Sequence, residues 1–176
     1  MEEAQLHDAE HGRVARGDGW FVLNLREAQW NGASGHGAYC AFESPEAPFP
    51  CYGINIHVLL PGEVSSKYHA EAAQEDFLVL DGECLALVEG RERRLARWDF
   101  LHCPGGTLHT FVGAGDGPCA ILMVGARLDD EGIVYPVSEL AARHGAGVAT
   151  ETSAPEEAYA DWPEPVLPCP APWPAG

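Results

Sequence analysis

His69, Glu71, Glu75 and His109 are the residues of this chain whose types and spacing best suit metal chemistry. Residues two apart in a β-strand project from the same face, so His69 and Glu71 are expected to point together. If two neighbouring hairpins turn these faces inward, all four side chains converge. Imidazole nitrogen and carboxylate oxygen bind Zn, Fe, Mn and Ni, and these ligand types do not select one of the four. The sequence therefore predicts one divalent transition metal, with Glu71 also a candidate catalytic proton carrier.

The elements that must hold these side chains are predicted as short strands separated by turns. Twenty Gly and fourteen Pro indicate many turns, as in all-β folds. Pro61-Gly62, Glu89-Gly90-Arg91 and the Gly-rich run 113–118 mark three of them. The spacing of the segments is that of a barrel or a sandwich. Strands are expected at 20–25, 53–60, 66–71, 75–81, 83–89, 92–97, 99–103, 108–113 and 118–127.

On two motifs the sequence resembles the cupin superfamily. The first motif is matched by Gly62, His69, Glu75 and Gly82, and the second by Pro104, Gly106 and His109. The likeness covers residues 53–125, and the chain looks like a small single-domain bacterial cupin. The resemblance implies an antiparallel jelly-roll β-barrel, commonly dimeric, that binds a divalent metal through the His and Glu residues of its motifs.

The chain departs from the family pattern at the His-x-His pair. Counted with the usual gap from Gly62, the two His positions fall on Tyr68 and Ala70, whereas a shift of one residue places them on His69 and Glu71. We prefer the shifted alignment because it keeps an allowed gap to Glu75. The site is then two His and two Glu, or two His and one Glu with Glu71 supporting them from behind or lying on the rim.

One further motif position departs from the pattern, and two other histidines are interpreted as structural. The Asn that often ends the second motif is replaced by Gly113. His57 lies in an apolar strand and is expected to be a core histidine. His102 precedes Cys103-Pro104 and is also expected to be structural.

The sequence divides into a flexible N-terminal segment (1–19), a β-barrel domain (20–130) and a C-terminal part (131–176). Ser138 precedes a short helical pattern that ends at Gly145, and a Pro-rich, extended tail follows. The tail lies on the barrel or is free in solvent, and Trp162 and Trp173 are its possible anchors.

Several predicted strands are apolar on both faces, for example 75–80 and 119–124. In a sheet with one face in solvent, apolar and polar residues would alternate along each strand. The second apolar face therefore has to be covered by another part of the protein. The N-terminal strand, the C-terminal segment and a second subunit are the candidates. We favour a homodimer, and the alternative is that the tails alone suffice.

Charge and cysteine pattern exclude several classes of protein. The net charge is −17, with Lys67 as the single lysine, so nucleic acid and membrane surfaces are not expected partners. The six cysteines form no C-x-x-C pair, which argues against a zinc ribbon or thioredoxin-like site. The N-terminus lacks the apolar run of a signal peptide, and no stretch has transmembrane length, so a cytoplasmic protein is expected.

These observations favour a metal-dependent enzyme that acts on a small molecule, of dioxygenase, isomerase or lyase type. Two alternatives stay open: a non-catalytic domain that binds or senses a small ligand or a metal, and an interaction protein that works through its tail. The sequence contains no Gly-x-Ser-x-Gly elbow and no phosphate-binding Gly loop with lysine.

Overall fold

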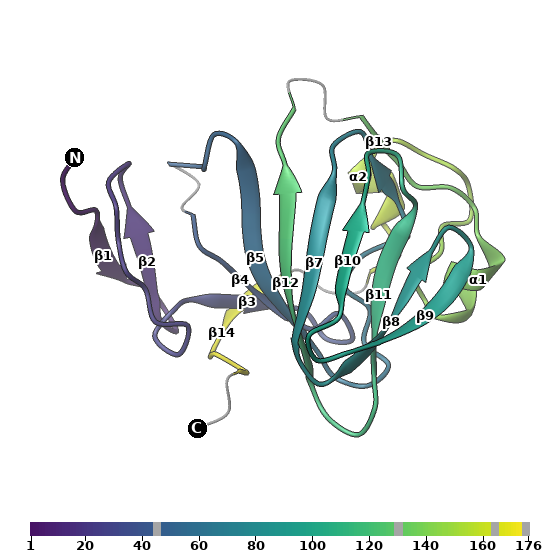
Figure 1. Cartoon of the computed structure of the whole chain (residues 1–176), viewed down its shortest axis with the longest axis horizontal. Coiled ribbons are helices and arrows are strands. Elements are labelled where there is room, and N and C mark those ends of the chain that lie inside the picture. Colours follow the sequence, from purple (N-terminus) through teal and green to yellow (C-terminus); the bar gives the residue numbers. More distant parts are fainter. Residues whose placement is uncertain (44–46, 129–131, 163–165, 174–176) are drawn as a thin grey trace.

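The fold consists mostly of antiparallel β-sheet, in a computed structural model that describes residues 1–43, 47–128, 132–162 and 166–173 (Figure 1). The largest sheet has the strand order β10-β7-β12-β5-β4-β3-β14, and a second has the order β11-β8-β9. Two smaller sheets are the hairpin β1-β2 and the pair β13-β6. The strands are β1 (Gln5–Asp8), β2 (Arg13–Arg16), β3 (Trp30–Gly32), β4 (Ala38–Ala41), β5 (Tyr52–Leu59), β6 (Ala70–Glu71), β7 (Glu75–Asp81), β8 (Glu83–Val88), β9 (Arg91–Ala96), β10 (Phe100–Cys103), β11 (His109–Ala114), β12 (Cys119–Ala126), β13 (Ile133–Val134) and β14 (Leu167–Cys169).

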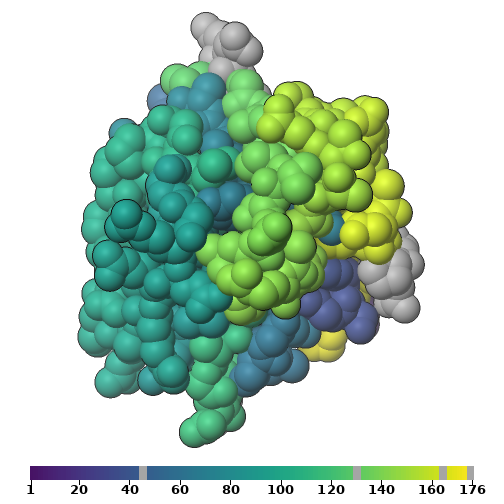
Figure 2. Space-filling view, turned by 90° about the vertical axis from the view of Figure 1, so that its right-hand side faces the viewer, coloured from purple at the N-terminus to yellow at the C-terminus, as the bar shows by residue number. Residues whose placement is uncertain are grey.

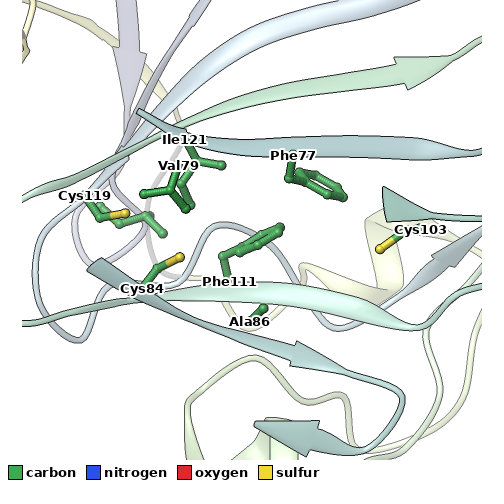
Figure 3. Close-up of a cluster of buried hydrophobic side chains, with 9 residues drawn as sticks. Phe77, Val79, Cys84, Ala86, Cys103, Phe111, Cys119 and Ile121 are labelled. Carbon is green, nitrogen blue, oxygen red and sulfur yellow. The ribbon is translucent and has the colours of Figure 1, made fainter. Parts of the chain in front are cut away.

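A hydrophobic core fills the space between the two large sheets (Figure 3). Alternate residues of β7 and β12 supply Phe77, Val79 and Ile121 from one side, because residues two apart share a face. Phe111 of β11 faces them from the other sheet, with its ring centroid 4.7 Å from that of Phe77. The Phe77 ring also lies 5.1 Å from the His109 imidazole, so the candidate metal ligands lie directly against this core.

The outer face of the large sheet is covered by residues from both ends of the chain. Ile56, Val58 and Ala120 on this face are buried against Trp30, which precedes β4 in the same sheet. Trp173 and other residues beyond β14 pack on the same cluster, and β14 pairs with β3. The termini therefore cover the apolar outer face within one chain, which is the alternative to a second subunit that the sequence left open.

The predicted first strand at residues 20–25 is wrong. Trp20 forms only an isolated bridge with Glu3, and Val22 is 76% exposed. A turn follows, in which the Asn24 side chain accepts a hydrogen bond from the Arg26 N–H and the Asn24 carbonyl accepts one from the Glu27 N–H. Asn competes for backbone hydrogen bonds in this way and so ends extended segments.

The terminal segments differ in part from what the sequence suggested. The hairpin β1-β2 lies within residues 1–19, for which flexibility stays a prediction. Helix α1 (Glu139–Arg143) begins after Ser138, whose hydroxyl accepts a hydrogen bond from the Ala141 N–H. The tail holds a second helix, α2 (Pro155–Ala158), that we did not predict. Figure 2 shows the C-terminal segment, in yellow-green, packed against the strands. Among the described residues, no helix has the length and apolar character needed to cross a membrane.

Candidate metal centre

His69 and His109 face each other on two neighbouring antiparallel segments. The His69 N–H donates to the His109 carbonyl at 3.2 Å, and the His109 N–H donates to the His69 carbonyl at 2.8 Å. A residue pair that exchanges both backbone hydrogen bonds is held at a fixed separation. The two imidazole centroids accordingly lie 5.0 Å apart. The fold thus brings together two histidines that are forty positions apart in the sequence.

Each imidazole is oriented by a backbone carbonyl two residues earlier. His69 Nδ1 lies 2.7 Å from the Lys67 carbonyl oxygen, and His109 Nδ1 lies 2.9 Å from the Thr107 carbonyl oxygen. Because a carbonyl only accepts, Nδ1 carries the proton in both rings. Each Nε2 is then the nitrogen with a free lone pair in the neutral ring.

Both Nε2 atoms point at carboxylates. His109 Nε2 lies 3.1 Å from a Glu75 carboxylate oxygen, and His69 Nε2 lies 3.6 Å from a Glu71 carboxylate oxygen. Glu71 is in β6 and Glu75 opens β7, so one turn delivers both acids. The four side chains therefore form two facing His–carboxylate pairs inside the fold.

This arrangement requires a proton or a metal ion between each Nε2 and its carboxylate. A neutral imidazole with its proton on Nδ1 presents a lone pair to a carboxylate oxygen, and two acceptors repel unless a proton or a metal ion lies between them. Burial lowers the pKa of His109, but the hydrogen bond and charge of Glu75 raise it by more, so it lies above its ordinary value. The contact with His69 lowers the pKa of Glu71, although burial opposes this.

The ligand atoms of His69, Glu75 and His109 all lie within 4.8 Å of one another. Two ligands of one metal, each at about 2.1 Å, lie at most about 4.2 Å apart. The three ligand atoms therefore need only small shifts to share one ion. The donor set, two imidazoles and one carboxylate, fits a divalent transition metal.

Glu71 lies beside this group rather than in it, with its side chain 33% exposed. It lines an open pocket of about 420 Å³, together with Ala70, Leu108, Val134, Pro136 and Glu151. The geometry leaves two roles open for Glu71, a fourth ligand and a carboxylate that faces a bound small molecule.

The other candidates from the sequence lie outside the centre. The Tyr68 hydroxyl accepts a hydrogen bond from the Gly90 N–H at 2.9 Å, on the far side from the imidazoles. His57 is buried in β5 and donates from Nε2 to the His36 carbonyl at 3.0 Å. His102 forms an ion pair with Asp76 at 2.6 Å on the surface of β10 and β7.

Two aromatic residues beside the centre were missed by sequence reasoning. Tyr135 is buried, with its ring 5.6 Å from that of His69, and Tyr159 packs edge-on against Tyr135 at 5.8 Å. The sequence signal for Tyr135 was the short apolar run 133–135 before Pro136, which we assigned to the tail region. Strand β13 in this run pairs with β6, next to Glu71.

Comparisons with known proteins agree with this fold. Residues 55–125 match the model of the cupin domain. A solved structure from Acidithiobacillus ferrooxidans, described as a "putative sugar phosphate isomerase", is 25% identical, with a TM-score of 0.51 over 57% of this chain and 67% of that one. KdgF from Halomonas sp. is 22% identical, with a TM-score of 0.51 over 64% of this chain and 97% of that one, and shows a likeness of fold alone.

The search of curated proteins gave no match. The domain match spans all four residues of the two His–carboxylate pairs. Residues 55–125 of this chain therefore form a cupin domain.

Proposed function

We propose that this chain is a metal-binding cupin and that it acts as a metal-dependent enzyme on a small molecule. The observation that carries the proposal is the pair of Nε2 atoms, fixed by their Nδ1 hydrogen bonds and aimed at two carboxylates. His69, Glu75 and His109 would hold one divalent metal, of which Zn, Fe, Mn and Ni are the candidates. When bound, such a metal supplies a Lewis acid.

Glu71 is the residue we assign to proton transfer. A Glu carboxylate is ionised near neutral pH and can accept a proton there. The Glu71 carboxylate lies between His69 and the open pocket, where a small molecule has access to it. A reaction that removes or relays a proton next to the metal would use this position.

Dioxygenase, isomerase and lyase chemistry are all compatible with this arrangement, because a fold does not choose among them. The likeness to the Acidithiobacillus protein supports isomerisation as one of the three. Of the residues that line the pocket, Glu71 and Glu151 are charged, and both are acidic. Phosphate groups are normally bound by Arg or Lys, so we do not extend the proposal to a phosphorylated substrate.

The second candidate is a non-catalytic domain that senses or binds a metal or a small ligand. It is favoured if Glu71 joins the other three residues as a ligand, since its carboxylate lies 3.6 Å from His69 Nε2. Four protein ligands close a tetrahedral site, whereas catalytic sites keep a position open.

Metal content tests the proposal directly. Elemental analysis of the untagged protein is expected to find close to one transition metal per chain, and the His109→Ala and Glu75→Ala variants are expected to lose it. His102→Ala is the matched control, because His102 also pairs with a carboxylate but outside the centre. Unchanged metal content in the Glu75 and His109 variants would overturn the proposal.

Coordination number separates the two candidates. X-ray absorption spectroscopy of the metal-loaded protein is expected to show three protein ligands plus solvent. Glu71→Gln should then leave the metal in place and change only its reactivity. Four protein ligands in the wild type, with loss of one in Glu71→Gln, would favour the non-catalytic domain.

The proposal extends to the architecture usual in the family: a closed jelly-roll barrel, a homodimer and a cytoplasmic location. The antiparallel pairing within the two largest sheets and the cupin neighbours support the barrel. An experimental structure of the protein in solution conditions that preserve its oligomer tests the first two points together.

A further inference from the structure

We propose that Lys67, held by Asp161, is a positioning residue for His69, so that the segment 146–161 forms part of the metal centre. The expected effect on metal affinity rests on the proposed function. The positioning of His69 itself rests on contacts among the described residues. The proposal assigns a role to the one lysine of the chain and to a segment that the sequence had left as a tail.

Lys67 is buried, and among the described residues the contacts of its ammonium group are with the C-terminal segment. The residue is 1% exposed. Its Nζ lies 2.7 and 2.9 Å from the two carboxylate oxygens of Asp161 and donates to the Gly147 carbonyl at 3.1 Å. The ammonium group also lies 5.8 Å from the centre of the Trp162 ring. A buried charge needs such partners, so these contacts fix where residue 67 lies.

The backbone of the same residues is bound to the same segment. The Lys67 N–H donates to the Tyr159 hydroxyl at 3.2 Å, and the Tyr68 N–H donates to the Ala146 carbonyl at 2.9 Å. The Lys67 carbonyl in turn accepts the 2.7 Å hydrogen bond from His69 Nδ1. The path from Asp161 to the imidazole therefore runs through a single residue, Lys67.

The second histidine has no such dependence. His109 Nδ1 donates to the Thr107 carbonyl, and Thr107 is held by the Pro104 carbonyl, which accepts from both its N–H and its hydroxyl. This support is a local turn in the residues just before β11. His109 consequently offers an internal control: a change at Asp161 should disturb His69 and leave His109 as it was.

The aromatic contacts add a second link from the same segment. Tyr159 packs edge-on against Tyr135, and Tyr135 lies against the His69 ring. Figure 2 shows the C-terminal segment as a continuous mass against the strands. Breaking the Asp161 contact should loosen both routes to His69 at once.

Asp161 is the position to change, because its side chain is 70% exposed, so its removal opens no cavity and acts through the lost partner of the buried Lys67 ammonium. The variants are Asp161→Ala, the conservative Asp161→Glu, and Glu156→Ala as an exposed carboxylate of α2 that is not a partner of Lys67. The first measurement is the ¹⁵N–¹H signal of each histidine Nδ1–H in the metal-free protein. The second is the dissociation constant for Zn²⁺, from competition with a chelator.

In Asp161→Ala we expect the His69 Nδ1–H signal to broaden or vanish while the His109 signal stays. We expect the affinity for Zn²⁺ to fall by about 10-fold or more, the usual loss when a group that orients a ligand is removed. Asp161→Glu should restore most of both, and Glu156→Ala should match the wild type. A merely structural weakening would affect both histidine signals together.

The two hypotheses fail in different ways. If the wild type binds Zn²⁺ and Asp161→Ala binds it equally well with its His69 signal intact, the role of Lys67 is overturned and the metal site stands. If the wild type binds no metal, the proposed function fails. The histidine signals then decide the positioning role alone: selective loss at His69 supports it, and retention overturns it.

Discussion

At the scale of single residues, His57 is a buried imidazole that the metal centre does not use. It is 9% exposed, it donates to the His36 carbonyl, and the titratable side chains beside it are His36 and Tyr39. Burial lowers the pKa of His57 from 6.5 to about 4. The folded protein therefore holds His57 neutral over a range in which the unfolded chain takes up a proton.

The sign of the effect follows from that difference. Between pH 6.5 and 4 the unfolded state binds more protons, so the free energy of unfolding falls as the pH falls, by on the order of 3 kcal/mol from this residue. In His57→Gln, whose amide can still donate to His36, we expect a loss between pH 7 and pH 4.5 that is smaller by about 2–3 kcal/mol. Urea unfolding at several pH values measures it. His7→Gln, an exposed histidine of β1, should behave like the wild type, and identical pH profiles for His57→Gln and wild type would contradict the assignment.

Gly113 explains one departure from the family motif. A Cβ at this position would lie 2.0 Å from the Leu60 carbonyl oxygen, and the Gly113 backbone exchanges hydrogen bonds with Gly62 and Glu63. No side chain fits without moving β11 from residues 60–63. We expect Gly113→Ala to lower the free energy of unfolding by about 1–3 kcal/mol in urea unfolding. Gly117→Ala, where nothing lies within 4 Å of the added Cβ, is the control and should be close to neutral.

The sequence was enough to predict which residues of the site lie together, but not how the two imidazole rings are oriented. Alternation along a strand was enough to group His69 with Glu71, and motif spacing was enough to join Glu75 and His109 to them. The Nδ1 hydrogen bonds to Lys67 and Thr107 could not be predicted, because they depend on local backbone geometry that residue types do not specify. Whether the four residues bind a metal stays a prediction.

At the scale of elements, the strands between residues 52 and 126 were the most predictable part of the chain. Runs with β-branched and aromatic residues between Gly and Pro turns gave β5, β7, β8 and β12 to within a residue or two. The run at 20–25 looked equally strong but has no partner strand, because the turn at Asn24 redirects the chain. Strand pairing between distant segments, such as β3 with β14, lies beyond a local pattern.

Helix α1 packs the C-terminal segment against the three-stranded sheet β11-β8-β9. Ala141 is fully buried in a cluster with Leu87 and Val112, and Ala146 after the helix accepts the hydrogen bond from Tyr68. We expect Ser138→Ala to remove the N-cap and to cost about 1 kcal/mol in urea unfolding. Ser153→Ala, at an exposed serine outside both helices, is the control. An equal effect of the two substitutions would show that the cap contributes nothing of its own.

At the scale of the whole molecule, the two ends of the chain complete the large sheet. The sequence indicated that the outer apolar face needed a cover, and of three candidates we favoured a second subunit. In the structure, Trp30 and Trp173 supply the cover from opposite ends of the chain. The outer face is therefore no longer an argument for a dimer, and the expectation of a homodimer has to rest on another surface.

The edges of the two sheets suggest where that surface lies. Strand β9, at one edge of the sheet β11-β8-β9, carries Arg91, Arg93 and Arg94. Charged side chains of this kind protect a sheet edge from pairing with another strand. β10, the edge of the large sheet, instead has Phe100 at 63% exposure, next to Trp98 at 68%. The exposed apolar residues at β10, in contrast to the charged residues of β9, suggest that β10 contacts a second copy of the chain.

We therefore predict that wild-type protein sediments as a dimer in analytical ultracentrifugation and that Phe100→Asp sediments as a monomer. Since each copy carries a net charge of −17, the copies repel, and raising the salt from about 0.05 to about 0.5 M should tighten the dimer by screening. Val22→Asp is the matched control, because Val22 is an equally exposed apolar residue away from β10. A monomeric wild type at both salt concentrations would remove the dimer, and a dimer that survives Phe100→Asp would place its interface elsewhere.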